Sequence, residues 1–385
     1  MPDRRRFLGF LTSGAVLAAM PMPGWPAVAG YQRLLVLVEL KGGNDGLNTI
    51  VPFADPAYAA LRPRLALERH SLLQLDERTG AHPQLAPLQA IWQQRELAIV
   101  QSVGYPDANL SHFRSIEIWD TASRSNQYLE EGWLGRTFAG KAPPASYAAD
   151  GVAVGSADLG PLAGAHARTV AIANARQFQQ LARTAQPRDG QGGGALQHLL
   201  KVEEDIAVAA QRLSSSYQFK TQFPDGAFGE SVKAACQIVA GGTGVAAIRL
   251  SLNGFDTHQN QPAKHADLLR QLAEGLLALR SAMQELGRWN ETLVMTYGEF
   301  GRRAKENQSN GTDHGTAAPQ LVLGGRVAGG LFGEAPRLNQ LDGNGNLPFA
   351  VDFRSLYATV LEDWWGMPSN TVLGGRFERL PLLRG

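Results

Sequence analysis

Cysteine is almost absent from this sequence, which contains only Cys236 among its 385 residues. No disulfide can therefore form within the chain, and the fold has to be stabilised by its hydrophobic core. A chain of this length buries a large fraction of its surface on folding, so a core alone suffices. The length is compatible with one large domain or two ordinary ones.

The chain also lacks basic clusters and a large net charge. Its formal charge is +1. Without Asp3 and Arg4–Arg6 the charge becomes +1 + 1 − 3 = −1. This balance argues against a nucleic acid as the partner. After residue 29, no apolar run reaches the roughly 18 residues that a membrane-spanning helix requires.

The first 29 residues show the order of parts that is typical of an export signal. Arg4–Arg6 precede Phe7 and Leu8, an apolar stretch follows over residues 10–20, and Ala27–Ala29 offers a small-residue cleavage site. The order Arg-Arg-x-Phe-Leu resembles a twin-arginine signal. The alternative is a short basic arm on a cytoplasmic protein. We expect residues 1–29 to be a signal peptide and the remaining chain to be periplasmic or secreted.

Short apolar runs bounded by glycine predict strands that are buried on both faces, as in a mostly parallel sheet. These runs cover residues 34–40, 97–103, 245–252, 292–297 and 320–323, with shorter strands expected at 152–154 and 170–172. Helical spacing of apolar residues predicts helices over 83–95, 111–122, 196–213, 262–286 and 352–365. Asp352 has the residue type of a helix N-cap.

Strands that alternate with helices indicate an α/β fold, with a mostly parallel sheet and helices on both faces. We expect a single domain over residues 30–385. One segment, residues 140–195, is rich in alanine, glycine and proline and fits this alternation poorly. It is interpreted as an insertion or as a divergent part of the sheet.

Chemically reactive side chains follow the predicted strand ends, where open α/β sheets bind their ligands. They lie in five loops, at residues 42–48, 109–114, 254–258, 298–303 and 311–316. Taken alone, each has a simpler explanation, such as a turn residue for Asp45 or an N-cap for Ser111. Together, they would surround one point with oxygen and nitrogen ligands. Such a set suits zinc, manganese, magnesium or calcium and includes no thiolate.

Ser111 is the candidate nucleophile. At a helix N-terminus its oxygen lies at the positive end of the helix dipole, and a bound metal would lower the pKa of its hydroxyl. Arg114 or Arg302 is expected to hold the non-bridging oxygens of a phosphate or sulfate ester in a bidentate fork. A surface or ion-pairing role is an equal alternative for Arg302.

The motifs together resemble the DUF1501 family. The resemblance rests on the twin-arginine start and on Gly-Gly-Asn-Asp-Gly-Leu-Asn at 42–48, Ser-His-Phe at 111–113, Phe-Asp-Thr-His at 255–258, Glu-Phe-Gly-Arg at 299–302 and Asp-His-Gly-Thr at 313–316. It covers essentially the whole chain. It implies an alkaline-phosphatase-like fold, because the family is grouped with the alkaline phosphatase and sulfatase superfamily.

The resemblance also implies roles for single residues. Ser111 matches the superfamily nucleophile. The implied metal ligands are Asp45, Asp256, His258, Glu299, Asp313 and His314. At Glu299-Phe300 the chain departs from the superfamily's Asp-His pair, and phenylalanine cannot bind a metal, so the site is expected to hold one ion rather than two, or none. His82 and His112 also fit the family pattern, but the sequence assigns neither a chemical role.

The sequence thus predicts an exported metal-dependent hydrolase of phosphate or sulfate esters, in which the metal is the cofactor and a small anionic ester is the substrate. The alternative is a non-catalytic periplasmic scaffold or binding protein with a degenerate metal site. The resemblance implies an exported partner of the DUF1800 type for that role. A carbohydrate-binding or surface-modifying role is a third interpretation, which the sequence neither favours nor excludes.

Overall fold

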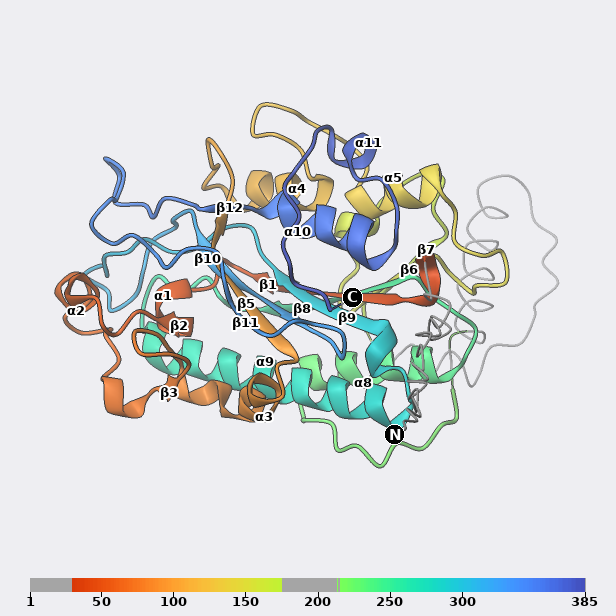
Figure 1. Ribbon diagram of the computed structural model, residues 1–385, viewed down its shortest axis with the longest axis horizontal. Coiled ribbons are helices and arrows are strands. Elements are labelled where there is room, and N and C mark those ends of the chain that lie inside the picture. The colour runs from red at the N-terminus through yellow and green to blue at the C-terminus, as the bar shows by residue number, and fades with distance from the viewer. Residues whose placement is uncertain (1–29, 175–212, 214, 385) are drawn as a thin grey trace, which may run out of the picture.

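The computed structural model describes residues 30–174, 213 and 215–384. The expected signal peptide lies outside the described residues, as does the helix expected over 196–213 except for its last residue. The described chain forms a central sheet with helices on both faces (Figure 1). No described helix combines the length with the apolar character that crossing a membrane requires.

Within the described residues, nine strands form one large sheet. Its order is β11-β5-β10-β9-β1-β8-β6-β7, and β12 also pairs with β5. All neighbouring pairs are parallel except those of β10, which runs antiparallel to both β5 and β9. The strands are β1 (Leu34–Lys41), β5 (Leu97–Gly104), β6 (Gly151–Val154), β7 (Thr169–Ile172), β8 (Ala247–Asn253), β9 (Thr292–Tyr297), β10 (Ala318–Leu323), β11 (Gly330–Phe332) and β12 (Val351–Asp352).

Helices cover the two faces of this sheet, as Figure 1 shows. One face carries α3 (Gln89–Gln93), α8 (Ala227–Ala240) and α9 (Gln261–Glu285). The other face carries α4 (His112–Thr121), α5 (Trp133–Gly140), α10 (Phe353–Thr359) and α11 (Asn370–Leu373). The predicted mostly parallel α/β architecture is therefore confirmed.

Shorter elements complete the fold. Two short helices, α1 (Gly46–Thr49) and α2 (Pro56–Leu61), follow β1. A second sheet of three short strands has the order β2 (Ile50–Val51), β4 (Gly80–Ala81), β3 (Leu73–Gln74). The 3₁₀ turns are η1 (Gly30–Gln32), η2 (Arg69–Ser71), η3 (Pro83–Leu88), η4 (Gly160–Leu162) and η5 (Trp289–Glu291), and η6 (Val360–Trp364) is a π-helical turn.

The first strand shows why these residues form a central strand. Leu34, Val36 and Val38 pack in the apolar cluster that includes α8 and α9, whereas Leu35 and Leu37 pack in the cluster on the opposite face. Successive side chains of a strand point to opposite faces, so a continuous apolar run satisfies both layers. Each buried leucine stabilises the fold by about 1.5–3 kcal/mol relative to an exposed one.

The five longer predicted strands are confirmed, with small shifts at their ends. The two shorter ones are confirmed as β6 and β7, so that the described part of the segment 140–195 adds strands to the edge of the sheet beyond β8. The N-cap role of Asp352 is confirmed, because its side chain accepts a hydrogen bond from the backbone N–H of Arg354.

One helix prediction was wrong in its extent. Residues 83–95 were expected to form one helix, but the structure has the 3₁₀ turn η3 followed by the short α3. Pro87 lies inside this segment, lacks a backbone N–H and clashes with the preceding helical turn. The apolar spacing was interpreted correctly as a buried face, but proline prevents a regular α-helix.

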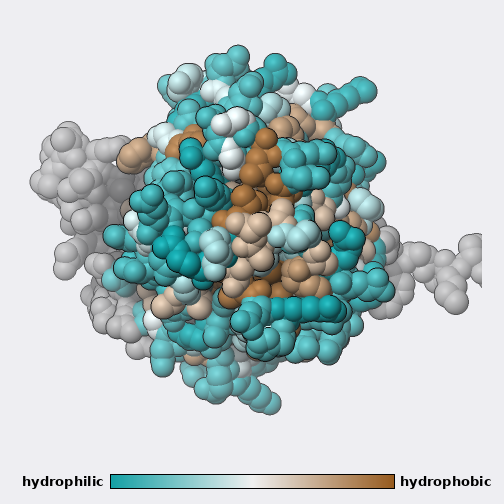
Figure 2. Space-filling model, turned by 90° about the vertical axis from the view of Figure 1, so that its left-hand side faces the viewer, coloured by the Kyte–Doolittle hydropathy of each residue, from teal (hydrophilic) through white to brown (hydrophobic). Residues whose placement is uncertain are grey.

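The carboxyl ends of the parallel strands lie on the left of Figure 1, near α1 and β12. Because β10 is antiparallel, its first residues lie at this same edge, so that the loop before β10 joins the loops that follow the other strands. Figure 2 views the molecule from this side and shows a central strip of apolar residues with hydrophilic residues around it.

Candidate metal centre

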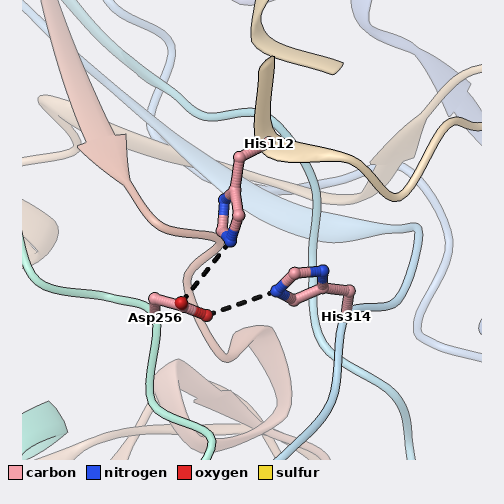
Figure 3. Close-up of side chains that lie close together, drawn as sticks. All are labelled: His112, Asp256 and His314. Carbon is pink, nitrogen blue, oxygen red and sulfur yellow. Dashed lines mark hydrogen bonds and ion pairs between the residues drawn. The ribbon is translucent and has the colours of Figure 1, made fainter. Parts of the chain in front are cut away.

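Three side chains from three separate loops meet at the carboxyl edge. His112 begins α4, Asp256 follows β8, and His314 precedes β10. Their potential ligand atoms all lie within 4.8 Å of one another. Figure 3 shows the imidazole rings of His112 and His314, each directed at the carboxylate of Asp256.

The Nε2 atoms of the histidines converge on Asp256. Nε2 of His112 lies 3.5 Å from Oδ2, and Nε2 of His314 lies 3.3 Å from Oδ1. His258 joins them, since its Nε2 lies 3.1 Å from Oδ1 of Asp256 and 2.9 Å from Nε2 of His314. Three imidazole nitrogens and one carboxylate therefore share a small volume.

The opposite ring nitrogens are held by acceptors. Nδ1 of His112 lies 2.8 Å from Oε1 of Glu299, and Nδ1 of His314 lies 2.9 Å from the carbonyl oxygen of Leu110. Nδ1 of His258 lies 3.2 Å from Oδ1 of Asp313. Acceptors at Nδ1 favour the tautomer that carries its proton there and leave Nε2 free to bind a cation, which is the arrangement found around metal-bound histidines.

Glu299 and Asp313 thus contact Nδ1 of His112 and His258, the ring nitrogens that face away from Asp256. Glu299 is buried, which raises the pKa of its carboxyl, and its Oε1 also accepts a 2.8 Å hydrogen bond from the backbone N–H of Gly42. Asp313 accepts hydrogen bonds from Asn307 and His258, and these lower the pKa of its carboxyl. Both residues were expected to be ligands, and in the structure their carboxylates contact Nδ1 of His112 and Nδ1 of His258.

Arg302 ties the loops of the site together. Its buried guanidinium donates to the carbonyl oxygens of Gly43 at 2.7 Å, Thr312 at 2.9 Å and Phe255 at 2.9 Å, and also to that of Gly42. It also pairs with Oδ1 of Asp256 at 2.7 Å. Partial burial of Asp256 acts against ionisation, yet the hydrogen bond from Arg302 lowers the pKa of this carboxyl below its usual value.

The glycine pair after β1 allows these loops to approach closely. Gly42 and Gly43 have backbone φ angles of 114° and 82°, which residues other than glycine rarely adopt. A Cβ atom on Gly42 would lie 2.4 Å from the backbone nitrogen of Asp256, and one on Gly43 would lie 2.6 Å from the ring of Phe300. Glycine is therefore required where this loop packs beneath the site.

Asp45 does not belong to the group of three that meets at the carboxyl edge. Its side chain is fully buried and forms a 2.6 Å ion pair with Arg62, and its Oδ2 also accepts from Gln261. Burial acts to raise the pKa of Asp45, but the adjacent Arg62 guanidinium lowers it overall. Arg62 also donates to the carbonyl oxygens of Arg303 and Ala304, so that this pair joins the loop after β1 to the loop after β9.

Ser111 lies beside the cluster as the N-cap residue of α4. Its side chain is exposed and forms no capping hydrogen bond, and it immediately precedes His112. Arg114 points elsewhere. Its guanidinium donates to carbonyl oxygens in the segment 124–127, pairs with Glu117 at 2.7 Å and lies 3.9 Å from the ring centroid of Tyr128.

The sequence offered one usable signal for His112, to which it gave no role. This histidine follows the candidate nucleophile directly, at the start of a helix that begins just after a strand end. Among the described residues it completes the only three-residue group with metal-ligand geometry. The prediction stopped at Ser111 because spacing alone does not show which of two adjacent side chains turns into the site.

Two further histidines, His82 and His265, are buried next to Asp45. Their ring centroids lie 5.9 Å apart, and Nε2 of His265 lies 2.9 Å from Oδ1 of Asn44. Burial lowers the pKa of each imidazole from 6.5 to about 4. Both rings are therefore neutral in the folded protein at neutral pH.

The burial of His82 and His265 predicts that the folded protein becomes less stable in acid. Below pH 6.5 the unfolded chain binds protons at these histidines, whereas the folded chain does so only near pH 4. The free energy of unfolding should therefore fall between these values, by up to about 1.4 kcal/mol per pH unit and histidine. Urea unfolding between pH 7 and 4.5 should show a smaller slope in His265→Gln than in the parent. Equal slopes would contradict the prediction, and the exposed His70→Gln serves as the control.

One known protein family matches most of this chain. The DUF1501 family, described as "Protein of unknown function", matches residues 66–374. This range includes the three residues of the cluster but not Asp45. No curated protein matches.

Solved structures show distant similarity. The C-terminal periplasmic domain of EcEptC from Escherichia coli, in complex with zinc, has a TM-score of 0.38 and 9% identity, over 76% of this chain and 72% of that one. The lipoteichoic acid synthase LtaP from Listeria monocytogenes has a TM-score of 0.41 and 8% identity, over 90% of this chain and 75% of that one. A protein in the alkaline phosphatase superfamily from Vibrio parahaemolyticus has a TM-score of 0.39 and 10% identity, over 89% of this chain and 69% of that one. Likeness at this level carries no information about activity. The family match spans more than half of the chain, and the protein therefore belongs to the DUF1501 family.

Proposed function

We propose that this protein is an exported metal-dependent hydrolase of phosphate or sulfate esters. The observation that carries the proposal is the convergence of His112, Asp256 and His314 within 4.8 Å, with His258 beside them. Two imidazoles and a carboxylate correspond to the three protein ligands of catalytic zinc sites, which leave a further position open for water or substrate.

The chemistry of the donors fits a divalent ion. Asp256 is held in its ionised form by Arg302, and each histidine has an acceptor at Nδ1. Nitrogen and oxygen donors without thiolate suit zinc or manganese. Such an ion, when bound, polarises an ester oxygen and lowers the pKa of a nearby hydroxyl. We assign His112, Asp256 and His314 to hold it, with His258 as the adjacent fourth donor.

The remaining roles belong to residues at the edge of this cluster. Ser111 is exposed, its hydroxyl forms no capping bond, and it adjoins His112, so it is assigned the attack on the ester. The free backbone N–H groups at the start of α4 would face the anionic group. Asp45 is left out of the ligand set because Arg62 already balances its charge.

Replacing Ser111 by alanine should lower turnover by more than about 10³-fold, as loss of a nucleophile does in hydrolases. The substitution removes the attacking oxygen but no proposed metal ligand, so bound metal should remain. A screen of phosphate and sulfate esters with the metal-loaded parent identifies the substrate first. The control is Ser71→Ala, an exposed serine in η2. Full activity of Ser111→Ala would refute the nucleophile.

A non-catalytic role remains the second candidate. Either Arg114 or Arg302 was expected to hold the ester, yet both donate to carbonyl oxygens of the protein. This loss of free guanidinium groups favours a protein that binds metal without turning over esters. Stoichiometric metal together with no turnover across the ester screen would support the second candidate and contradict the first.

A further inference from the structure

A cavity of about 180 Å³ lies between the large sheet and the small three-stranded sheet with its adjoining η3 and α3. Its wall contains ten hydrophobic residues and three glutamines, with no ionisable side chain. The residues that line it belong to β2, β3, β4, η3, α3, β5 and β10, apart from Leu75. None of the proposed metal ligands contributes to it.

The inner part and the mouth of the cavity differ in polarity. Leu85, Leu88 and Ile99 are almost fully buried and form part of the apolar floor. The glutamines Gln74, Gln89 and Gln93 are exposed and form the polar part of the wall. An occupant would therefore meet hydrocarbon inside and neutral amide groups at the surface.

Protein interiors contain few voids larger than a water molecule, because unfilled space forfeits packing contacts. Water is a poor occupant of an apolar cavity, since it needs two to four polar partners. An apolar protein cavity of roughly 150 Å³ is known to stay dry and to bind benzene. The volume and the hydrophobic part of the lining are similar here, but this cavity opens to the surface beside the glutamines.

We propose that this cavity binds a small uncharged amphiphile, in which an alkyl chain or aromatic ring of about benzene's size enters the floor and a neutral hydrogen-bonding head meets the glutamines. No charged side chain lines the wall, so an ionic head would find no ion-pair partner there, whereas a neutral head can hydrogen-bond to the glutamines. This site is independent of the metal centre and of the esterase proposal.

The test uses benzene and hexan-1-ol as probes on the purified protein. Titration is followed by NMR of the leucine and isoleucine methyl groups, which should shift at Leu88 and Ile99 with saturable binding. Ala81→Leu adds a side chain into the cavity and should weaken benzene binding by at least about tenfold. Ala86→Leu adds the same atoms at an exposed position of η3 and should bind as the parent does.

Several outcomes would overturn the proposal. These are no saturable binding by the parent, shifts confined to other methyl groups, or equal benzene affinity in Ala81→Leu and the parent. Should Ala81→Leu fail to fold, Gln89→Leu provides the second comparison. This variant should bind hexan-1-ol more weakly than the parent and bind benzene equally well. An unchanged affinity for hexan-1-ol would contradict the role given to the glutamines.

Discussion

Replacing His112 by alanine is expected to raise the dissociation constant for Zn²⁺ by more than about 100-fold, the upper range for loss of a residue that only orients a ligand. The reason is that His112 is one of the three residues whose ligand atoms lie within 4.8 Å of one another, so the variant removes one of three proposed ligands. Competition titration against a chromogenic chelator measures the constant. The fold should survive, because His112 is only partly buried.

Two companion variants sharpen this result. Glu299→Gln keeps an acceptor near Nδ1 of His112 but removes its charge, so zinc affinity should fall by about 10–100-fold. His70→Ala removes an exposed imidazole that lies outside the cluster, and its zinc affinity should equal that of the parent. An unchanged affinity in His112→Ala would show that the ion, if bound, has other ligands.

Replacing Asp45 by alanine should reduce the free energy of unfolding by about 3–5 kcal/mol, the cost of leaving one charge of a buried pair without its partner. Both side chains of the Asp45–Arg62 pair are fully buried, and the variant would leave the guanidinium of Arg62 without its carboxylate partner. Urea unfolding at pH 7 measures the change. The zinc content should stay as in the parent.

A surface ion pair provides the matched control for this stability effect. Asp267→Ala breaks the exposed pair with Arg270 and should leave the free energy of unfolding nearly unchanged. If Asp45→Ala instead removed the metal and left stability intact, Asp45 would belong to the ligand set, as the family resemblance implied.

The fold could be predicted well because its signals are local. The run from Leu34 to Leu40 is apolar at every position but Glu39, and this single departure is resolved in the interior by an ion pair with Arg249. The antiparallel direction of β10 could not be predicted. A short apolar run does not indicate whether a strand pairs parallel or antiparallel to its neighbours. The loop before β10 was nevertheless grouped correctly with the strand-end loops. Pro87 was visible, yet the apolar spacing around it was given more weight.

The sequence predicted the loops of the candidate site and three of the side chains that meet there, Asp256, His258 and His314, but it gave no role to His112. Asp256 and His314 meet as the sequence suggested, since the sheet topology brings their loops to one edge. Asp45 was grouped with them because a carboxylate after a first strand has the right type and place. Its partner Arg62 lies 17 residues further on, and only the three-dimensional packing shows that they pair. The same holds for Arg302, whose acceptors come from three loops.

The central claim is that the cluster around Asp256 holds a divalent ion. The most direct measurement is elemental analysis of the mature protein, purified without chelator, beside the Asp256→Ala/His314→Ala double variant. The proposed site predicts a stoichiometric ion in the parent and its loss in the variant, with both proteins folded. Folded protein without metal in either sample, even after addition of zinc or manganese, would contradict the claim.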